Sequence, residues 1–305
     1  MRVSNLKRLV IGAPFPTRME IHERLDKVRA LAVFASDPIS SNAYATEAIM
    51  GILIVLGSGA LTLTMPIAIA IALLILLVVF SYIQTILHYP GGGGAYTVAK
   101  DNLGVMPSLI AAAALLIDYV LTVSVSVSAG VRAVSSAFPV AHDYRVIISL
   151  TVIAIITLIN LRGVRESGTV FAIPTYAFVG GVLLVISLGL VRYFGLFGAA
   201  PLVPAPAVPE LEPHVGLVYV WLLLRAFAAG CTALTGIEAI SNGVPAFKPP
   251  EATNAAKTMV AMGAIAMTLF LGISFLATDL RIVPSEKIST LSQMTEAISG
   301  RGLLY

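Results

Sequence analysis

Long apolar segments separated by short polar ones dominate the chain. Seven of them approach or exceed the roughly 20 residues that an α-helix needs to cross a membrane. We therefore predict an all-α membrane protein whose spans lie near residues 30–56, 62–88, 106–138, 144–160, 169–194, 216–246 and 256–279.

The first apolar segment is interrupted at its centre by Ser-Asp-Pro-Ile-Ser-Ser, residues 36–41. A carboxylate at bilayer depth costs about 2.5–3.5 kcal/mol on insertion scales, so Asp37 is a candidate functional residue. A helix broken near the midplane is typical of transporter binding sites. The sixth segment predicts a second break at residues 230–236, where small and β-branched residues weaken helix continuity.

Basic residues predict the orientation, because Lys and Arg favour the cytoplasmic side. They gather before the first span, at Arg2, Lys7, Arg8, Arg18, Arg24, Lys27 and Arg29. We expect residues 1–28 to be a cytoplasmic segment and residues 29–280 to be the transmembrane core. Residues 281–305 would be an extracytoplasmic tail leading to a further span that this sequence lacks.

Composition narrows the functional classes. Hydrophobic residues make up 58% of the chain and charged residues 11%, whereas about 25% are charged in soluble domains. The single cysteine leaves no intrachain disulfide. The net charge of +3 comes from basic residues scattered around membrane ends, which does not favour a nucleic-acid partner. No nucleophile–base pair or metal-ligand cluster indicates an enzyme, and no cofactor is expected.

Four acidic residues fall inside the predicted spans: Asp37, Glu47, Asp118 and Glu238. Together they would oppose insertion by about 10 kcal/mol unless paired, hydrated or neutralised. Hydroxyl groups accompany three of them. Asp118, Thr122 and Ser126 share one helix face at i, i+4 and i+8, Glu238 follows Thr235 by three, and Tyr44 lies two turns after Asp37. Such oxygens suit a monovalent cation or a proton, and unwound backbone carbonyls bind Na⁺ in transporters of this kind.

Each acid has an alternative structural explanation. Asp37 before Pro38 is also a good N-cap. Asp118 could pair with a hydroxyl or with Arg132, and Glu238 could pair with Arg225 or lie close to the cytoplasmic end. Glu47 favours a structural role, since little else that is polar shares its face.

The two breaks and a glycine-rich turn resemble the amino acid–polyamine–organocation (APC) superfamily. Three motifs carry this resemblance: residues 36–41, the run Tyr-Pro-Gly-Gly-Gly-Gly-Ala-Tyr at 89–96, and residues 226–241 followed by Lys-Pro-Pro-Glu at 248–251. The resemblance implies the LeuT-like five-plus-five inverted repeat, here truncated after about seven helices. Amino acid permeases of the superfamily usually carry glycines at the first break, where this chain has Asp37 and Pro38.

Within the superfamily, the chain is most similar to the KimA-type branch of the potassium uptake (KUP) importers. That resemblance implies potassium held by Asp37, Asp118, Thr122, Ser126 and Thr235, with Tyr44 and Tyr119 also lining the site. Crowded carboxylates cannot all ionise around one monovalent ion. One acid should therefore carry the coupling proton, with Glu238 as the first candidate and Asp118 as the second.

We therefore expect a proton-coupled potassium importer that works by alternating access. It would be a multi-pass protein of the cell membrane with a cytoplasmic N-terminus, and a homodimer is compatible with this reading. Potassium and the proton would be the transported species. The alternative is an APC amino acid or polyamine permease in which Asp37 binds an amine, and a third reading is a membrane sensor that keeps the fold.

Overall fold

The computed structural model describes residues 24–161, 164–204, 216–285, 287–302 and 305. These residues form helices and a single isolated bridge between Leu25 and Phe247, so the prediction of an all-α fold is confirmed. Most of the predicted cytoplasmic segment 1–28 lies outside the described residues.

The α-helices run through the chain as α2 (Lys27–Phe34), α3 (Ser36–Leu53), α4 (Thr64–His88), α5 (Gly94–Leu103), α6 (Val105–Ala137), α7 (Arg145–Asn160), α8 (Val164–Tyr193), α9 (Leu217–Gly230), α10 (Ala239–Asn242), α11 (Glu251–Asp279) and α12 (Thr290–Ser299). Short 3-10 helices join them: η2 (Ile54–Leu56), η3 (Ser58–Leu63), η4 (Pro139–His142), η5 (Leu196–Gly198), η6 (Cys231–Leu234) and η7 (Val244–Ala246).

Six helical stretches of the described chain are long and apolar enough to cross a membrane: Ser36–Leu56, Ser58–His88, Val105–Ala137, Gly168–Tyr193, Leu217–Asn242 and Glu251–Asp279. The remaining predicted span, near residues 144–160, corresponds to α7, which has 16 residues. At 1.5 Å per residue α7 measures about 24 Å, less than the roughly 30 Å hydrocarbon core. That it crosses the membrane stays a prediction.

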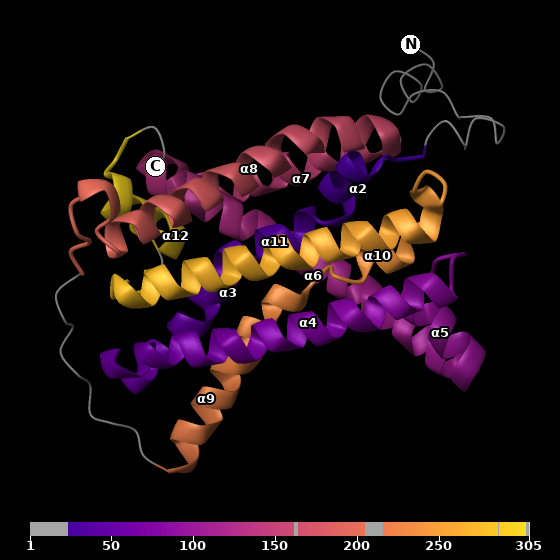
Figure 1. The fold of residues 1–305 in the computed structure, drawn as a ribbon, viewed down its shortest axis with the longest axis horizontal. Helices are drawn as coiled ribbons and strands as arrows, with labels where there is room; N and C mark the ends of the chain where they lie inside the picture. Colours follow the sequence, from indigo (N-terminus) through magenta and orange to yellow (C-terminus); the bar gives the residue numbers. More distant parts are fainter. Residues whose placement is uncertain (1–23, 162–163, 205–215, 286, 303–304) are drawn as a thin grey trace.

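Close packing in the core depends on small residues. A Cβ atom at Gly230 of α9 would come within 2.6 Å of the Ile49 side chain of α3, and one at Gly263 of α11 within 2.9 Å of Val79 of α4. Small residues let membrane helices approach one another in this way, since lipid gives them little hydrophobic reason to associate. Figure 1 shows α11 and α4 running side by side, with α3 and α9 behind them.

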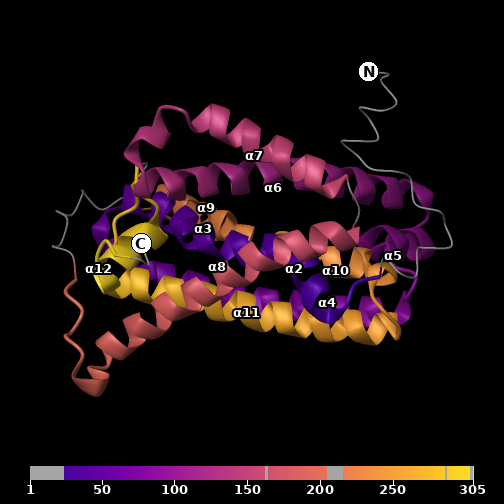
Figure 2. The same cartoon turned by 90° about the horizontal axis from the view of Figure 1, so that it is seen from above.

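The two interrupted spans are joined at the end of the bundle where the segment before α2 meets the segment after α10. The N–H of Leu25 donates to the carbonyl of Ala246 at 2.7 Å, the N–H of Lys248 donates back to Leu25 at 2.9 Å, and the Phe34 and Phe247 rings stack at 5.6 Å. In Figure 1, α2, α5 and α10 lie at one end of the bundle and α12 at the other. Viewed from above, α6 and α7 form the opposite side from α11 (Figure 2).

Two elements were not predicted from the sequence. The segment after α11 contains the amphipathic helix α12, and the glycine-rich run leads directly into α5. The expected tight turn at residues 89–96 is present, because Gly92, Gly93 and Gly94 all have positive φ.

Candidate functional site

The first interruption is shorter than the sequence suggested. Only Ala35 separates α2 from α3, and α3 begins at Ser36 rather than after residues 36–41. The N-cap reading of Asp37 is therefore wrong. Ala35 is the N-cap, it has no side-chain cap, and Asp37 lies within the first helical turn. Pro38 fits that turn because the first amides of a helix have no intrahelical acceptor.

The second interruption is longer and confirms the expected break. After η6 the backbone becomes extended at Thr235, with φ −63° and ψ 136°, and it turns through Gly236 at φ +82°. Helical structure returns only at Ala239. Glycine suits this position because it adopts positive φ without a Cβ clash.

The two interruptions meet at Asp37 and Gly236. A Cβ atom at Gly236 would lie 2.5 Å from Oδ2 and 2.7 Å from Cγ of Asp37, and 2.8 Å from Cδ of Pro38. The carboxylate therefore packs directly on the bare backbone of the unwound segment. No other residue type would leave room for this approach.

Hydroxyl groups extend from Asp37 across to α6. The Ser41 hydroxyl donates to Oδ1 of Asp37 at 3.2 Å, and its oxygen is 2.9 Å from the Tyr44 hydroxyl. The Tyr44 hydroxyl lies 3.0 Å from the Ser126 hydroxyl. Sequence reasoning missed Ser41 as a member of the site, although its i+4 spacing from Asp37 was visible.

Two further predicted residues of α6, Asp118 and Thr122, lie on the same helix face as Ser126, and Thr235 lies in the second break. Asp118 is half-buried and lies within electrostatic reach of both Asp37 and Glu238. Thr122 is half-buried one turn further along. The Thr235 hydroxyl donates to the Thr232 carbonyl at 2.8 Å, which leaves the Thr235 oxygen able to accept or to coordinate.

At the start of α10, Glu238 is 7% exposed, and its Oε1 has no hydrogen-bond partner within the described chain. Nearby, Asn242 donates from Nδ2 to the Tyr119 hydroxyl at 2.8 Å, and its carbonyl accepts the N–H of Gly93 at 3.3 Å. Asn242 therefore joins α6, α10 and the glycine-rich turn. The sequence analysis did not single it out.

Ion pairing removes two of the structural alternatives. Arg132 binds Glu47, with Nη2 at 2.8 Å from Oε1, so it does not neutralise Asp118. Arg225 is exposed, and among the described residues it forms no ion pair with Glu238. The structural role expected for Glu47 agrees with its pairing, although the sequence did not reveal the partner.

A pocket of about 1060 Å³ leads from Tyr44 to the exposed Arg145 near the end that carries α12. Its lining comes from α3, α6, α7 and the segment after α11. Among the described residues, no group of three His, Cys, Asp or Glu side chains has the arrangement of a metal site. The oxygen atoms where the two interruptions meet, at Asp37 and Gly236, would instead suit a monovalent cation. Protein oxygens can replace the water molecules that hydrate such an ion.

Comparison with known proteins identifies relatives. A family model described as amino acid permease matches residues 25–299. The potassium transporter KimA of Bacillus subtilis (strain 168) is 44% identical over 301 residues, which cover 99% of this chain and 49% of KimA. The chain therefore spans about half the length of that relative.

Two plant proteins share a smaller region. Cationic amino acid transporter 7 of Arabidopsis thaliana, a chloroplastic protein, is 29% identical over 37% of the chain and 22% of its own length. Cationic amino acid transporter 6, also chloroplastic and from the same plant, is 30% identical over 44% of the chain and 24% of its own length.

Proposed function

Because the chain belongs to the amino acid permease family, we propose that it forms the cation-binding core of a secondary transporter that imports potassium together with protons by alternating access. One observation carries this proposal: the carboxylate of Asp37 packs on the unwound backbone at Gly236 and continues into the hydroxyl chain to Ser126. A side-chain charge, the backbone of the unwound segment and a chain of hydroxyl groups thus lie together between two interrupted helices.

The charge balance at the junction favours a cation. Asp37, Asp118 and Glu238 lie close enough to interact. Arg132, which the sequence offered as a possible partner of Asp118, is bound to Glu47 instead. In a low-dielectric surrounding, unopposed acids attract a positive ion. Potassium is proposed as that ion, held by Asp37, Asp118, Thr122, Ser126 and Thr235.

Glu238 is proposed to carry the coupling proton, and Asp118 is the second candidate. A buried carboxylate with an unpartnered oxygen is costly when charged, whereas the neutral acid is tolerated. The unpartnered Oε1 of Glu238 supports this assignment. With Glu238 protonated and potassium bound at Asp37, two of the three acids are neutralised, and a nearly neutral loaded site favours moving both ions together.

The relatives support the choice of substrate. KimA, which is named a potassium transporter, shares 44% of residues over nearly all of this chain. The protein is a multi-pass membrane protein, and we propose the cell membrane as its location with the N-terminus in the cytoplasm. Assembly into a homodimer is a further expectation for the full-length protein.

A second candidate is import of a cationic amino acid or polyamine. Two similar plant proteins are named cationic amino acid transporters, and Asp37 could bind an amine. The first break argues against an amino acid, because Asp37 would repel the substrate carboxylate and Pro38 has no N–H to bind it.

Uptake into liposomes that contain the protein expressed from its full reading frame separates the two. We expect accumulation of rubidium, used as a potassium tracer, with competition by potassium and stimulation by an inward proton gradient. Radiolabelled arginine and putrescine should not accumulate. Accumulation of arginine or putrescine without rubidium would replace the proposal by the second candidate, and binding without any accumulation would favour a sensor.

A further inference from the structure

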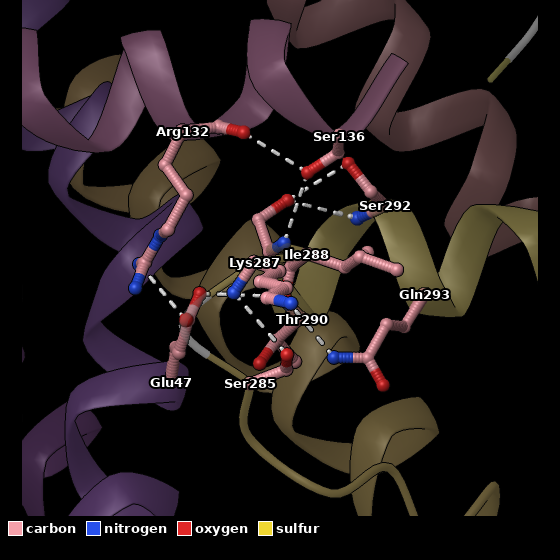
Figure 3. A network of polar contacts seen from close by, with 10 residues as sticks. Glu47, Arg132, Ser136, Ser285, Lys287, Ile288, Thr290, Ser292 and Gln293 are labelled. Atoms are coloured by element: carbon pink, nitrogen blue, oxygen red, sulfur yellow. Dashed lines mark hydrogen bonds and ion pairs between the residues drawn. The ribbon is translucent and has the colours of Figure 1, made fainter. Parts of the chain in front are cut away.

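A second polar cluster lies outward from the site, between α3, α6 and the start of α12 (Figure 3). Oε1 of Glu47 is 2.8 Å from Nη2 of Arg132, and Oε2 of Glu47 accepts the backbone N–H of Thr290 at 3.1 Å. The Glu47 side chain is only about 7% exposed. One buried carboxylate therefore connects three separate elements, with each of its oxygens engaged.

Further contacts bind α12 to α6. The N–H of Ser289 donates to the Ser136 hydroxyl at 3.1 Å, and the Ser136 carbonyl accepts the Tyr305 hydroxyl at 3.0 Å. Figure 3 shows Ser136 and Arg132 reaching from the same helix toward the start of α12. The opposite end of α12 is held by α8, because Arg192 donates to the Ile298 carbonyl at 2.5 Å. Separation at Glu47 would therefore break the hydrogen bond between α3 and the start of α12, while Ser136 and Arg192 would still hold this segment to α6 and α8.

The cluster is also connected to the candidate cation site. Glu47 follows Tyr44 by three residues on α3, so the two side chains are neighbours on one helix face. Tyr44, Glu47 and Arg132 all line the pocket that leads to the exposed Arg145. The α3–α6 contact is thus made twice, by hydroxyls at Tyr44 and Ser126 and by an ion pair further out.

We propose that Glu47 and Arg132 are positioning residues of the transport cycle. Their ion pair fixes α3 against α6 and, through Thr290, holds the start of α12 beside the pocket, whose edge is lined by the preceding Pro284 and Ser285. The pair separates when the cation site opens to the outside and reforms when it closes. The inference rests on the proposed transport function, but its first test below does not require the substrate to be known.

Accessibility of the pocket tests the pair directly. Ser135 lines the pocket and is only 6% exposed while the pair is formed. Ser135→Cys can be introduced into full-length protein in which Cys231→Ser removes the one cysteine of this chain. A membrane-impermeant thiol reagent, applied to intact cells, measures access from outside. Glu47→Gln and Arg132→Gln should each speed labelling by about tenfold, because removing one partner of a buried ion pair favours separation.

A double-variant cycle distinguishes a pair from two independent residues. Glu47→Gln combined with Arg132→Gln should label at a rate close to that of the single variants, because there is only one interaction to lose. Unchanged labelling in both single variants would overturn the proposal, as would effects that multiply in the double variant. Labelling that occurs only in inside-out vesicles would also overturn it.

A nearby ion pair supplies the matched control. Glu296 pairs with Arg301 at 2.8 Å in the same outer segment, but both side chains are well exposed. Glu296→Gln should leave labelling at the parent rate, and an equal acceleration would show that any lost charge loosens this end. If Glu47→Gln does not reach the membrane, Glu47→Asp is expected to give an intermediate rate, and a parent rate would contradict the pair.

Transport supplies a second readout that simple misfolding would not reproduce. A weakened pair should favour the outward-open form, so KM for external rubidium should fall while the maximal rate also falls. Loss of folded protein would lower the maximal rate alone, which would count against the proposal. If the parent protein transports no rubidium, the proposed function fails while the labelling experiment still decides the role of the pair.

Discussion

The two interruptions differ in how far the helix is broken. At the first, hydrogen bonds continue across the gap, from Ala35 N–H to Leu31 and from Ile39 N–H to the Ala35 carbonyl. At the second, Thr235 is extended and Gly236 has positive φ, so the regular ladder is lost until Ala239. The nearly continuous helix supplies the charged side chain, and the unwound one supplies the space at Gly236 into which that side chain packs.

Because of this difference, the two breaks have distinct structural roles. A carboxylate on a firmly held helix turn is presented in a fixed position, whereas an irregular backbone at membrane depth is tolerated where it lines a binding cavity. Gly236 makes the meeting possible because it has no side chain to displace Asp37. Variants at each break should therefore have effects of different kinds.

The largest effect is expected for Asp37→Asn. The loss of the charge removes a charge-assisted interaction worth about 2–3 kcal/mol, which corresponds to a decrease of about 100-fold in rubidium uptake. Initial uptake rates in liposomes measure it. Asp101→Asn, at an exposed position on α5, is the control and should retain parent uptake. Normal uptake by Asp37→Asn would separate the first break from cation binding.

A somewhat smaller loss is expected for Gly236→Ala. The added methyl group would lie 2.5 Å from the Asp37 carboxylate at a residue with positive φ. The backbone conformation alone costs about 1–2 kcal/mol, so uptake should fall by about tenfold and thermal stability in detergent should decrease. Gly130→Ala on α6, where nothing lies within 4 Å of the new atom, should change neither. Tolerance of alanine at 236 would show that the two breaks need not touch.

The third variant concerns the proton rather than the cation. Glu238→Gln cannot release a proton, so uptake should lose its dependence on external pH, with a maximal rate about tenfold lower, equivalent to about 1.4 kcal/mol. Rubidium uptake measured from about pH 5 to about pH 8, the range over which physiological proton switches act, tests this. A parent-like pH profile with normal uptake would remove Glu238 from the proton route and leave Asp118 as the candidate.

The smallest effect is expected at the start of α2, outside the apolar spans. Asp26 caps this helix by accepting the N–H of Arg29 at 3.0 Å and that of Val28 at 3.1 Å. The hydrogen bond from Arg29 holds the pKa of the Asp26 carboxyl below its usual value. A lowered folded-state pKa contributes stability above the unfolded pKa, and this contribution is lost as the pH falls through the folded value.

Asp26→Ala should therefore cost about 1 kcal/mol at pH 7. The difference from the parent should disappear under acid conditions in which the carboxyl of the parent is protonated. Thermal unfolding in detergent at both conditions measures it. A penalty of equal size at both would mean that the charge of Asp26 does not stabilise α2.

Much of this arrangement was visible in the sequence because it is local. Apolar length predicted the spans, and Pro38, Gly236 and the acids beside them indicated the breaks. The exact extent of the first break was not predictable, because Pro38 fits equally well after a break or inside a first turn. In the structure α3 begins at Ser36, one residue before Asp37.

Contacts between distant parts of the chain could not be predicted in the same way. Glu47 looked isolated because its partners Arg132 and Thr290 lie on other elements. The hydrogen bond from Asn242 to Tyr119 depends on the break in the sixth span, which precedes α10. Helix α12 was missed because it is too short and polar to resemble a span.

The most direct test of the central claim is an experimental structure of the full-length protein with rubidium, whose anomalous scattering locates the ion. We predict a peak at the junction, in contact with Asp37 and with hydroxyl oxygens of Thr122, Ser126 or Thr235. Rubidium bound elsewhere in a transport-active protein, with the space between Asp37 and Gly236 empty, would contradict the account.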